Sequence, residues 1–128
     1  MTIPIIKGLQ QLNCSNCYKL IKIPYIEGIK KLICYNCPLL KEIPYIKSLK
    51  YLDCSKCPLI EIIPNFTYLN ILDCFNCNKI KIIPCIKYLK YLDCSDCHFL
   101  EYISYIDGLL SINCSYCYLL KKFHILIV

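Results

Sequence analysis

The chain has 128 residues, of which 57% are hydrophobic and 19% charged, and this composition excludes an intrinsically disordered protein. Its net charge of +6 comes from 15 Lys residues without any Arg. Because Lys cannot form the bidentate contacts that Arg makes with phosphate and guanine, a nucleic-acid-binding function is disfavoured. Charged residues interrupt every apolar run, so no segment reaches the ~18 apolar residues of a membrane-spanning helix.

A twenty-residue repeat runs through the chain and predicts one domain, residues 1–128, built from six units. Each unit holds one Cys-x-x-Cys pair, and the pairs are Cys14 and Cys17, Cys34 and Cys37, Cys54 and Cys57, Cys74 and Cys77, Cys94 and Cys97, and Cys114 and Cys117. Columns of Leu, Ile and Pro keep the same period, without insertion or deletion. Residues 121–128 begin a partial seventh arc.

The first element of each unit is predicted to be a short strand. In the third unit, Leu52 and Cys54 are two positions apart, which is the alternation of a β-strand. The equivalent strands are expected, in chain order, around residues 12–14, 32–34, 52–54, 72–74, 92–94 and 112–114. Stacked units would pair these strands in one parallel sheet with a spacing of about 4.8 Å.

The rest of each unit is predicted to be a non-helical return arc. After Cys54 the apolar residues recur at every third position, at Cys57, Ile60, Ile63 and Phe66. An α-helix needs mixed steps of three and four, whereas 3₁₀ and polyproline II conformations have about three residues per turn. A single coil cannot bury its apolar edge, but stacked coils can. The sequence therefore predicts a solenoid of six coils, with a short parallel sheet on one face and 3₁₀ or polyproline II arcs on the other.

The segment from Leu89 to Ile103, "LKYLDCSDCHFLEYI", resembles the leucine-rich repeat pattern LxxLxLxxN/CxxL. Leu89, Leu92 and Cys94 match its inward strand positions, and Cys97 matches the Asn-or-Cys position after the strand. The match covers all six units, and it most resembles the short, cysteine-containing leucine-rich repeats of giant viruses of amoebae and of protists. The resemblance implies a leucine-rich repeat solenoid whose concave sheet face binds a protein partner.

The cysteine pairs have three interpretations. The spacing from Cys54 to Cys77 satisfies a zinc-site pattern, and stacking brings equivalent cysteines within disulfide range. However, parallel Cβ vectors give a poor disulfide dihedral angle, and Zn–S bonds near 2.3 Å need sulfurs closer than the coil spacing. Because a free Cys is a small, often buried hydrophobe, core packing is favoured. We expect the column cysteines to be buried and reduced, with no metal or cofactor, and Cys85 to be an exposed thiol.

No catalytic site is evident, and the chain is not expected to be an enzyme. Catalysis needs a base beside a nucleophile or paired carboxylates in a cleft. The only histidines are His98 and His124, and His98 is expected on the surface. Gly8, Gly28 and Gly108 share one turn column and look structural rather than phosphate-binding.

The candidate partner-binding residues lie on the predicted sheet face, between the inward positions. They are an aromatic and apolar patch with a row of acids: Tyr35, Tyr51, Asp53, Ile71, Asp73, Phe75, Tyr91 and Asp93. Aromatic anchors ringed by polar groups are typical of interaction hot spots, and stacked carboxylates repel one another. These features favour a protein partner with a cationic segment, although strand propensity and repeat copying would also produce them.

Two further expectations concern location and the ends of the array. The start of the chain does not resemble a signal peptide, which favours a reducing cytoplasmic or nuclear location, in a host cell if the protein is viral. The first coil has no polar cap, which favours self-association through it. Phe123 and Leu126 are expected to fold over the sixth coil as a lid. The alternatives to a binding module are a self-assembling structural protein or a thiol-rich metal-binding or redox protein.

Overall fold

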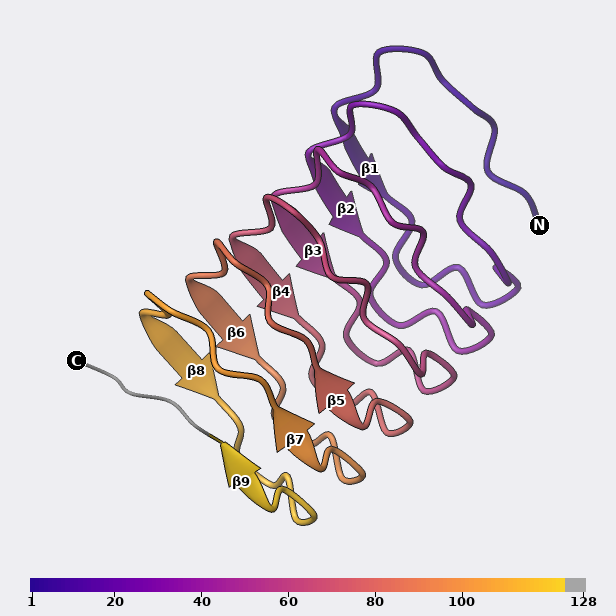
Figure 1. The fold of residues 1–128 in the computed structure, drawn as a ribbon. Coiled ribbons are helices and arrows are strands. Elements are labelled where there is room, and N and C mark those ends of the chain that lie inside the picture. The colour runs from indigo at the N-terminus through magenta and orange to yellow at the C-terminus, as the bar shows by residue number, and fades with distance from the viewer. Residues whose placement is uncertain (124–128) are drawn as a thin grey trace.

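A six-stranded parallel sheet forms one side of the molecule in the computed structural model, which describes residues 1–123 (Figure 1). Its strands, in spatial order, are β1 (Gln11–Asn13), β2 (Lys31–Ile33), β3 (Tyr51–Asp53), β4 (Ile71–Asp73), β6 (Tyr91–Asp93) and β8 (Ser111–Asn113). Neighbouring strands pair in register at a twenty-residue offset, so that Leu52 lies between Leu32 and Leu72. The predicted solenoid is confirmed. No helix long and apolar enough to cross a membrane occurs in the described residues.

The backbone ladder continues beyond the three-residue strands on both sides. Before β3, Lys50 N–H donates to the Lys30 carbonyl at 2.8 Å. After it, Cys54 N–H donates to the Asp73 carbonyl and Lys56 N–H to the Phe75 carbonyl, both at 2.9 Å. The strict repeat length places each donor opposite the same acceptor in the next coil, which is why such short strands form a sheet.

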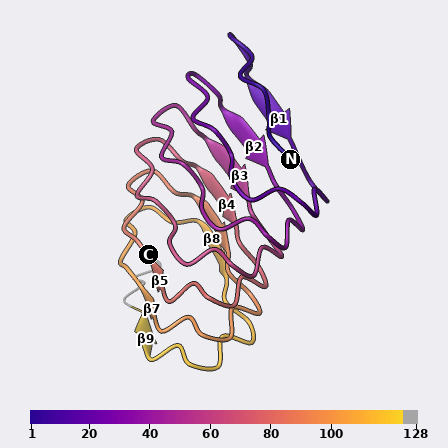
Figure 2. The same cartoon turned by 90° about the vertical axis from the view of Figure 1, so that its right-hand side faces the viewer.

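A second, three-stranded parallel sheet lies on the return arcs. It consists of β5 (Ile82–Ile83), β7 (Tyr102–Ile103) and β9 (Lys122–Phe123), and an isolated bridge joins Lys22 to Glu42 in the first two arcs. Figure 2 shows β5, β7 and β9 on a different side of the coil from the six-stranded sheet. The prediction of purely 3₁₀ or polyproline II arcs is therefore wrong at these positions. Extended arcs stacked in register expose unpaired N–H and C=O groups, and β-branched residues such as Ile82 favour pairing them.

The core is one continuous stack of inward side chains. In the third unit, the predicted inward residues Leu52, Cys54, Cys57, Ile60 and Ile63 are all at most 3% exposed. Phe66 is the largest fully buried side chain and replaces the Ile of other coils. The first coil differs, because Leu9 and Leu12 are only partly buried. The predicted lid lies outside the residues whose side chains are described, since β9 ends at Phe123 and Leu126 lies beyond it.

Candidate partner-binding face and the cysteine turns

Each Cys-x-x-Cys segment forms the turn at the carboxyl end of a sheet strand. The residue before the second Cys has a left-handed backbone in all six coils, with φ between 55° and 60°: Asn16, Asn36, Lys56, Asn76, Asp96 and Tyr116. Asn and Asp tolerate this region best among residues with a side chain. The prevalence of Asn and Asp at this position is a sequence signal for the turn. The Cys-x-x-Cys spacing is therefore the spacing of a turn in the solenoid.

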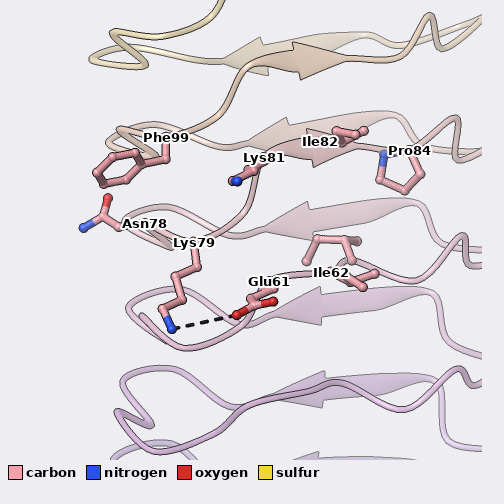
Figure 3. A pocket seen from close by; sticks show the side chains of 9 residues that line it. Glu61, Ile62, Asn78, Lys79, Lys81, Ile82, Pro84 and Phe99 are labelled. Carbon is pink, nitrogen blue, oxygen red and sulfur yellow. Dashed lines mark ion pairs between the residues drawn. The ribbon is translucent and has the colours of Figure 1, made fainter.

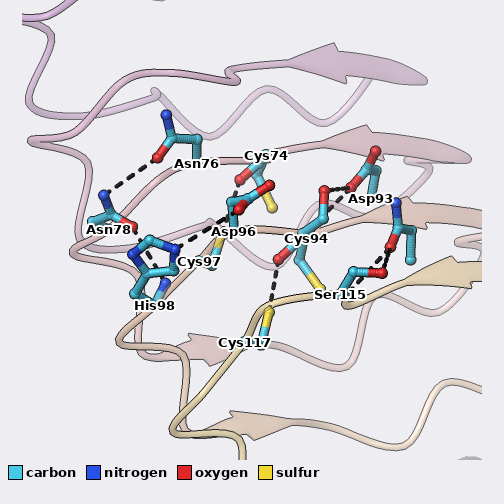
Figure 4. Close-up of polar contacts among 12 residues, drawn as sticks. Cys74, Asn76, Asn78, Asp93, Cys94, Asp96, Cys97, His98, Ser115 and Cys117 are labelled. Atoms are coloured by element: carbon cyan, nitrogen blue, oxygen red, sulfur yellow. Dashed lines mark hydrogen bonds and ion pairs between the residues drawn. The ribbon is translucent and has the colours of Figure 1, made fainter.

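The second cysteine of each later pair forms a hydrogen-bond ladder along the stack. Its Sγ lies 3.0–3.2 Å from the backbone carbonyl oxygen of the first Cys in the preceding coil. The thiol therefore donates a hydrogen bond to that carbonyl. Figure 4 shows two of these bonds, from Cys97 to the Cys74 carbonyl and from Cys117 to the Cys94 carbonyl. The sequence predicts burial of these thiols but not this role.

All thirteen cysteines are free thiols, and their exposure varies with position in the stack. The pairs in the middle coils are buried, as predicted, and Cys85 is exposed on its arc. The prediction is wrong for Cys17, Cys114 and Cys117, which are half-buried because a terminal coil covers each side chain on one side only. Within residues 1–123, no group of three or more Cys, His, Asp or Glu side chains could hold a metal ion.

The thiols differ in pKa according to these surroundings. A hydrogen bond with the Cys77 thiol and complete burial raise the pKa of Cys54 well above its ordinary value. Burial, with the neighbouring Cys37 thiol, raises the pKa of Cys14 to about 12. A hydrogen bond from the Cys94 thiol instead lowers the pKa of Cys117 to about 7. Thiolate is the reactive form, so the first cysteines of the middle coils are inert thiols.

The sheet face presents three outward columns from the strands and the turns that follow them. The predicted residues Tyr51, Ile71 and Tyr91 lie opposite one another in the first column. The acid row (Asp53, Asp73 and Asp93) forms the second column. Tyr35 and Phe75 belong to the third, on the turns after β2 and β4. The acid row therefore runs between two groups of aromatic side chains.

Two members of the acid row also stabilise the turns. Asp53 Oδ1 accepts the Ser55 backbone N–H at 2.9 Å, and Asp93 Oδ1 accepts the Ser95 N–H at 2.9 Å and its hydroxyl at 2.6 Å. Asn13 and Asn113 accept the same pair of bonds in the end coils. Ser55 and Ser95 lie two residues after these acids, at positions that strand alternation would place on the exposed face, but both are buried. Ser15 and Ser115, which make the same bonds in the end coils, are not buried.

Asp73 is bonded differently from its neighbours in the row. Residue 75 is Phe rather than Ser, and the Asp73 carboxylate accepts the Tyr51 hydroxyl at 3.3 Å instead. Partial burial, and then the Asp53 and Asp93 charges, raise the pKa of Asp73. In the described chain, none of the three carboxylates forms an ion pair with a Lys side chain. Among the described residues, the row therefore has no cation in ion-pair contact with it.

The lysines near this face contact the aromatic rings rather than the carboxylates. Lys31 Nζ lies 4.7 Å from the centre of the Tyr51 ring. Lys56 Nζ lies 5.4 Å from the Tyr35 ring centre and 5.8 Å from that of Phe75, and these two rings are 6.3 Å apart. These ammonium-to-ring distances are within the ~6 Å range of cation–π contacts. Tyr35, one of the candidate residues expected from the sequence, is thus part of a ring pair that contacts an ammonium group.

His98 lies at the surface on the turn side, as predicted. Its Nε2 is 3.8 Å from Asp96 Oδ1 (Figure 4). Its ring lies 5.3 Å from that of Tyr118. Its backbone N–H donates to the Asn78 side chain at 3.2 Å. These contacts hold His98 against its own turn and the turns of the two neighbouring coils.

Comparison with known proteins supports a leucine-rich repeat protein. The family model described as Leucine Rich Repeat matches residues 48–69, which contain β3, its cysteine turn and the following arc. No curated protein and no solved structure gives a significant match to the chain. Leucine-rich repeat proteins usually mediate protein–protein interactions and are generally non-catalytic.

Proposed function

We propose that the protein is a non-catalytic binding module whose sheet face binds a protein partner through a cationic segment. The observation that carries the proposal is the acid row between two groups of aromatic rings, which forms no ion pair within the described residues. The candidate residues are those expected from the sequence, Tyr35, Tyr51, Asp53, Ile71, Asp73, Phe75, Tyr91 and Asp93.

Electrostatics favours a cationic partner. Like charges directly opposite one another in a parallel ladder repel, and the raised pKa of Asp73 reflects that repulsion together with burial. A Lys or Arg side chain laid along the row would lower the free energy of all three carboxylates. The surrounding rings add apolar area and cation–π attraction, which are the features of an interaction hot spot.

The contacts of Lys31 and Lys56 support the same preference. Each ammonium group lies over a ring of the patch, so the ring faces already accept alkylammonium groups. A partner's cation would find rings and acids arranged in adjacent columns. The net charge of +6 makes this surface an acidic exception on a basic protein.

The test is the triple variant Asp53→Asn, Asp73→Asn and Asp93→Asn. Asn is the natural residue at positions 13 and 113, where it accepts the same turn hydrogen bonds, so the fold should be retained. Titration calorimetry with a synthetic Lys- and Arg-rich peptide should show at least about tenfold weaker binding and a smaller salt dependence. The exposed Asp107→Asn substitution is the matched control. Equal peptide affinity in wild type and triple variant would refute the proposal.

Self-assembly through the first coil is the second candidate function. β1 is an edge strand of the described sheet, and Ile5 and Ile6 of the same coil are exposed. Unpaired edges with apolar neighbours are templates for pairing with another chain. The double substitution Ile5→Lys and Ile6→Lys should then shift the sedimentation coefficient of the protein toward that of the monomer.

The proposed intracellular location follows from the same thiol-rich core. Free buried thiols with raised pKa values suit a reducing compartment. The likeness to repeats of giant viruses and protists stays a prediction from the sequence.

A further inference from the structure

A groove of about 790 Å³ lies on the return arcs between the third and fourth coils, away from the sheet face (Figure 3). Glu61 and Ile62 line one side, Lys81 and Ile82 line the other, and Phe99 stands at one end. Ile62 is 74% exposed, Ile82 55% and Phe99 54%. Leu39, at the position equivalent to Phe99 in the second coil, is 45% exposed. Contiguous exposed apolar side chains of this kind mark interaction surfaces.

The groove lies where the backbone pairing between successive return arcs is interrupted. Three backbone hydrogen bonds join residues 81–84 to the equivalent residues 101–104, two to the Lys81 carbonyl and one to the Ile83 carbonyl. Within the described chain, none joins residues 61–64 to the equivalent residues of either neighbouring arc. The third arc therefore forms no backbone hydrogen bonds with the arcs on either side. The apolar side chains around it line a groove there instead of covering a paired sheet.

A row of alternating charge borders the apolar side chains. The residue that precedes the exposed position of each arc is Lys41, Glu61, Lys81 and Glu101 in successive coils. The first three are exposed, and the side chain of Glu101 is 41% exposed. The two acids also form surface ion pairs within the chain, Glu61 with Lys79 at 3.8 Å (Figure 3) and Glu101 with Lys121 at 3.3 Å. All four charges are thus open to solvent on the face that holds the groove.

We propose that this arc face binds a second copy of the chain, with the two solenoids antiparallel. A two-fold axis in the plane of the face and perpendicular to the stacking direction places each column opposite itself in reverse order. With the axis between the third and fourth coils, Glu61 faces Lys81 of the second copy, and Lys41 faces Glu101. The same operation places Ile62 against Ile82 and Leu39 against Phe99 of the second copy.

The charge row selects this arrangement over the parallel one. An axis along the stacking direction through the row would place Lys81 opposite the second copy's Lys81 and Glu61 opposite its Glu61, and such like-charge contacts oppose association. The antiparallel arrangement is closed, since both copies use the same surface. It leaves both sheet faces free, so the pair would bind a repetitive partner with increased avidity. The inference does not depend on the proposed function of the sheet face.

The experiment is a charge exchange followed by sedimentation velocity at increasing protein concentration. The wild type should show a concentration-dependent dimer. Lys81→Glu should place Glu opposite Glu, and Glu61→Lys should place Lys opposite Lys, so each variant alone should dimerise at least about tenfold more weakly. An equimolar mixture of the two variants restores both opposite-charge contacts and should form a heterodimer of near wild-type affinity. Association through the first coil cannot give this pattern.

Matched controls carry the same charge changes on the opposite turn of the coil. Lys47→Glu and Glu27→Lys should leave dimerisation unchanged, whereas Ile62→Thr with Ile82→Thr should weaken it without unfolding the chain, because both side chains are exposed. Circular dichroism of each variant confirms the fold. A wild type that stays monomeric at high micromolar concentration overturns the proposal, as do single charge variants that dimerise like the wild type.

Discussion

The two sides of each coil hold together in different ways. On the sheet side, backbone hydrogen bonds link all six strands and continue into the cysteine turns, where thiols add a second ladder. On the arc side, pairing joins the first two arcs and the last three but omits the third. The sequence follows the same division. Cys occupies both turn columns in every unit, whereas the exposed arc column reads Lys22, Glu42, Ile62, Ile82 and Tyr102.

This contrast shows which repeated positions the fold requires. A position that bonds its equivalents in both neighbouring coils cannot change without affecting three coils. A position that points away from the stack can vary, and such positions carry the acid row, the aromatic rings and the charged arc row. The strictly repeated residues therefore maintain the solenoid, and the variable ones differentiate its surfaces.

Truncation of a core side chain should give the largest difference in unfolding free energy between the sheet side and the arc side. Leu72 is fully buried between Leu52 and Leu92, so Leu72→Ala should cost about 3–4 kcal/mol of unfolding free energy. Ile62→Ala on the arc side should change it by less than about 0.5 kcal/mol, because that side chain is mostly exposed. Urea denaturation at low protein concentration measures both. Similar losses in the two variants would mean that the arc side is packed as tightly as the sheet side.

Removal of one thiol hydrogen bond between coils should lower the unfolding free energy by an intermediate amount. Cys77→Val keeps the apolar volume but leaves the buried Cys54 carbonyl without its donor, which should cost about 1–2 kcal/mol. Cys85→Val, at an exposed thiol on the arc side, is the control and should cost less than about 0.5 kcal/mol. If Cys77→Val is as stable as wild type, the thiols act as apolar filler only.

Replacement of Lys56, whose backbone is left-handed, should have a smaller effect and should raise the unfolding free energy rather than lower it. Lys56 has a φ of 55° where four of the other five coils have Asn or Asp, so Lys56→Asn should raise the unfolding free energy by about 1 kcal/mol. The reverse change at the equivalent position, Asn76→Lys, should lower it by a similar amount. Thermal unfolding of the pair checks the assignment, and a loss on Lys56→Asn would show that the ring contacts of Lys56 outweigh backbone strain.

The acid row should give the smallest effect, as a pH dependence. The pKa of Asp73 in the folded chain is raised above its ordinary value of 3.8, so the folded state binds this proton more readily than the unfolded state. Wild type should therefore gain stability relative to Asp73→Asn as pH falls through the raised pKa toward 3.8. The gain is small because the carboxylate is partly exposed. Denaturation series between neutral and acidic pH would show the opposite slope if a cation already compensated the row.

The repeat period makes the solenoid predictable, because one spacing fixes the strands and inward columns of every coil. That spacing assigns Leu52, Cys54 and Phe66 to the core, and all three side chains are buried there. The second sheet does not follow from it, since a spacing of three says where side chains point but not whether neighbouring backbones pair. Ile82 and Tyr102 pair through backbone geometry that is set by the stack as a whole.

The site is predictable only in part. The order of residues along each strand places Tyr51 and Asp53 on one face, and the structure agrees on their arrangement. Their role in binding stays a proposal. The thiol ladder cannot be derived from the Cys-x-x-Cys pattern, because zinc sites, disulfides and core turns share that spacing. The signal that distinguishes them is the Asn or Asp before the second cysteine, which Lys56 and Tyr116 obscure.

The most direct test of the structural role of the cysteines is the mass of the native protein under non-reducing conditions, before and after a chelator. We expect the mass of the chain with all thirteen thiols protonated, unchanged by the chelator, together with an unchanged unfolding midpoint. Excess mass that the chelator removes would show that the cysteine turns bind metal. A deficit of two hydrogens per bond would show that they form disulfides, and either result would contradict a ladder of thiol donors.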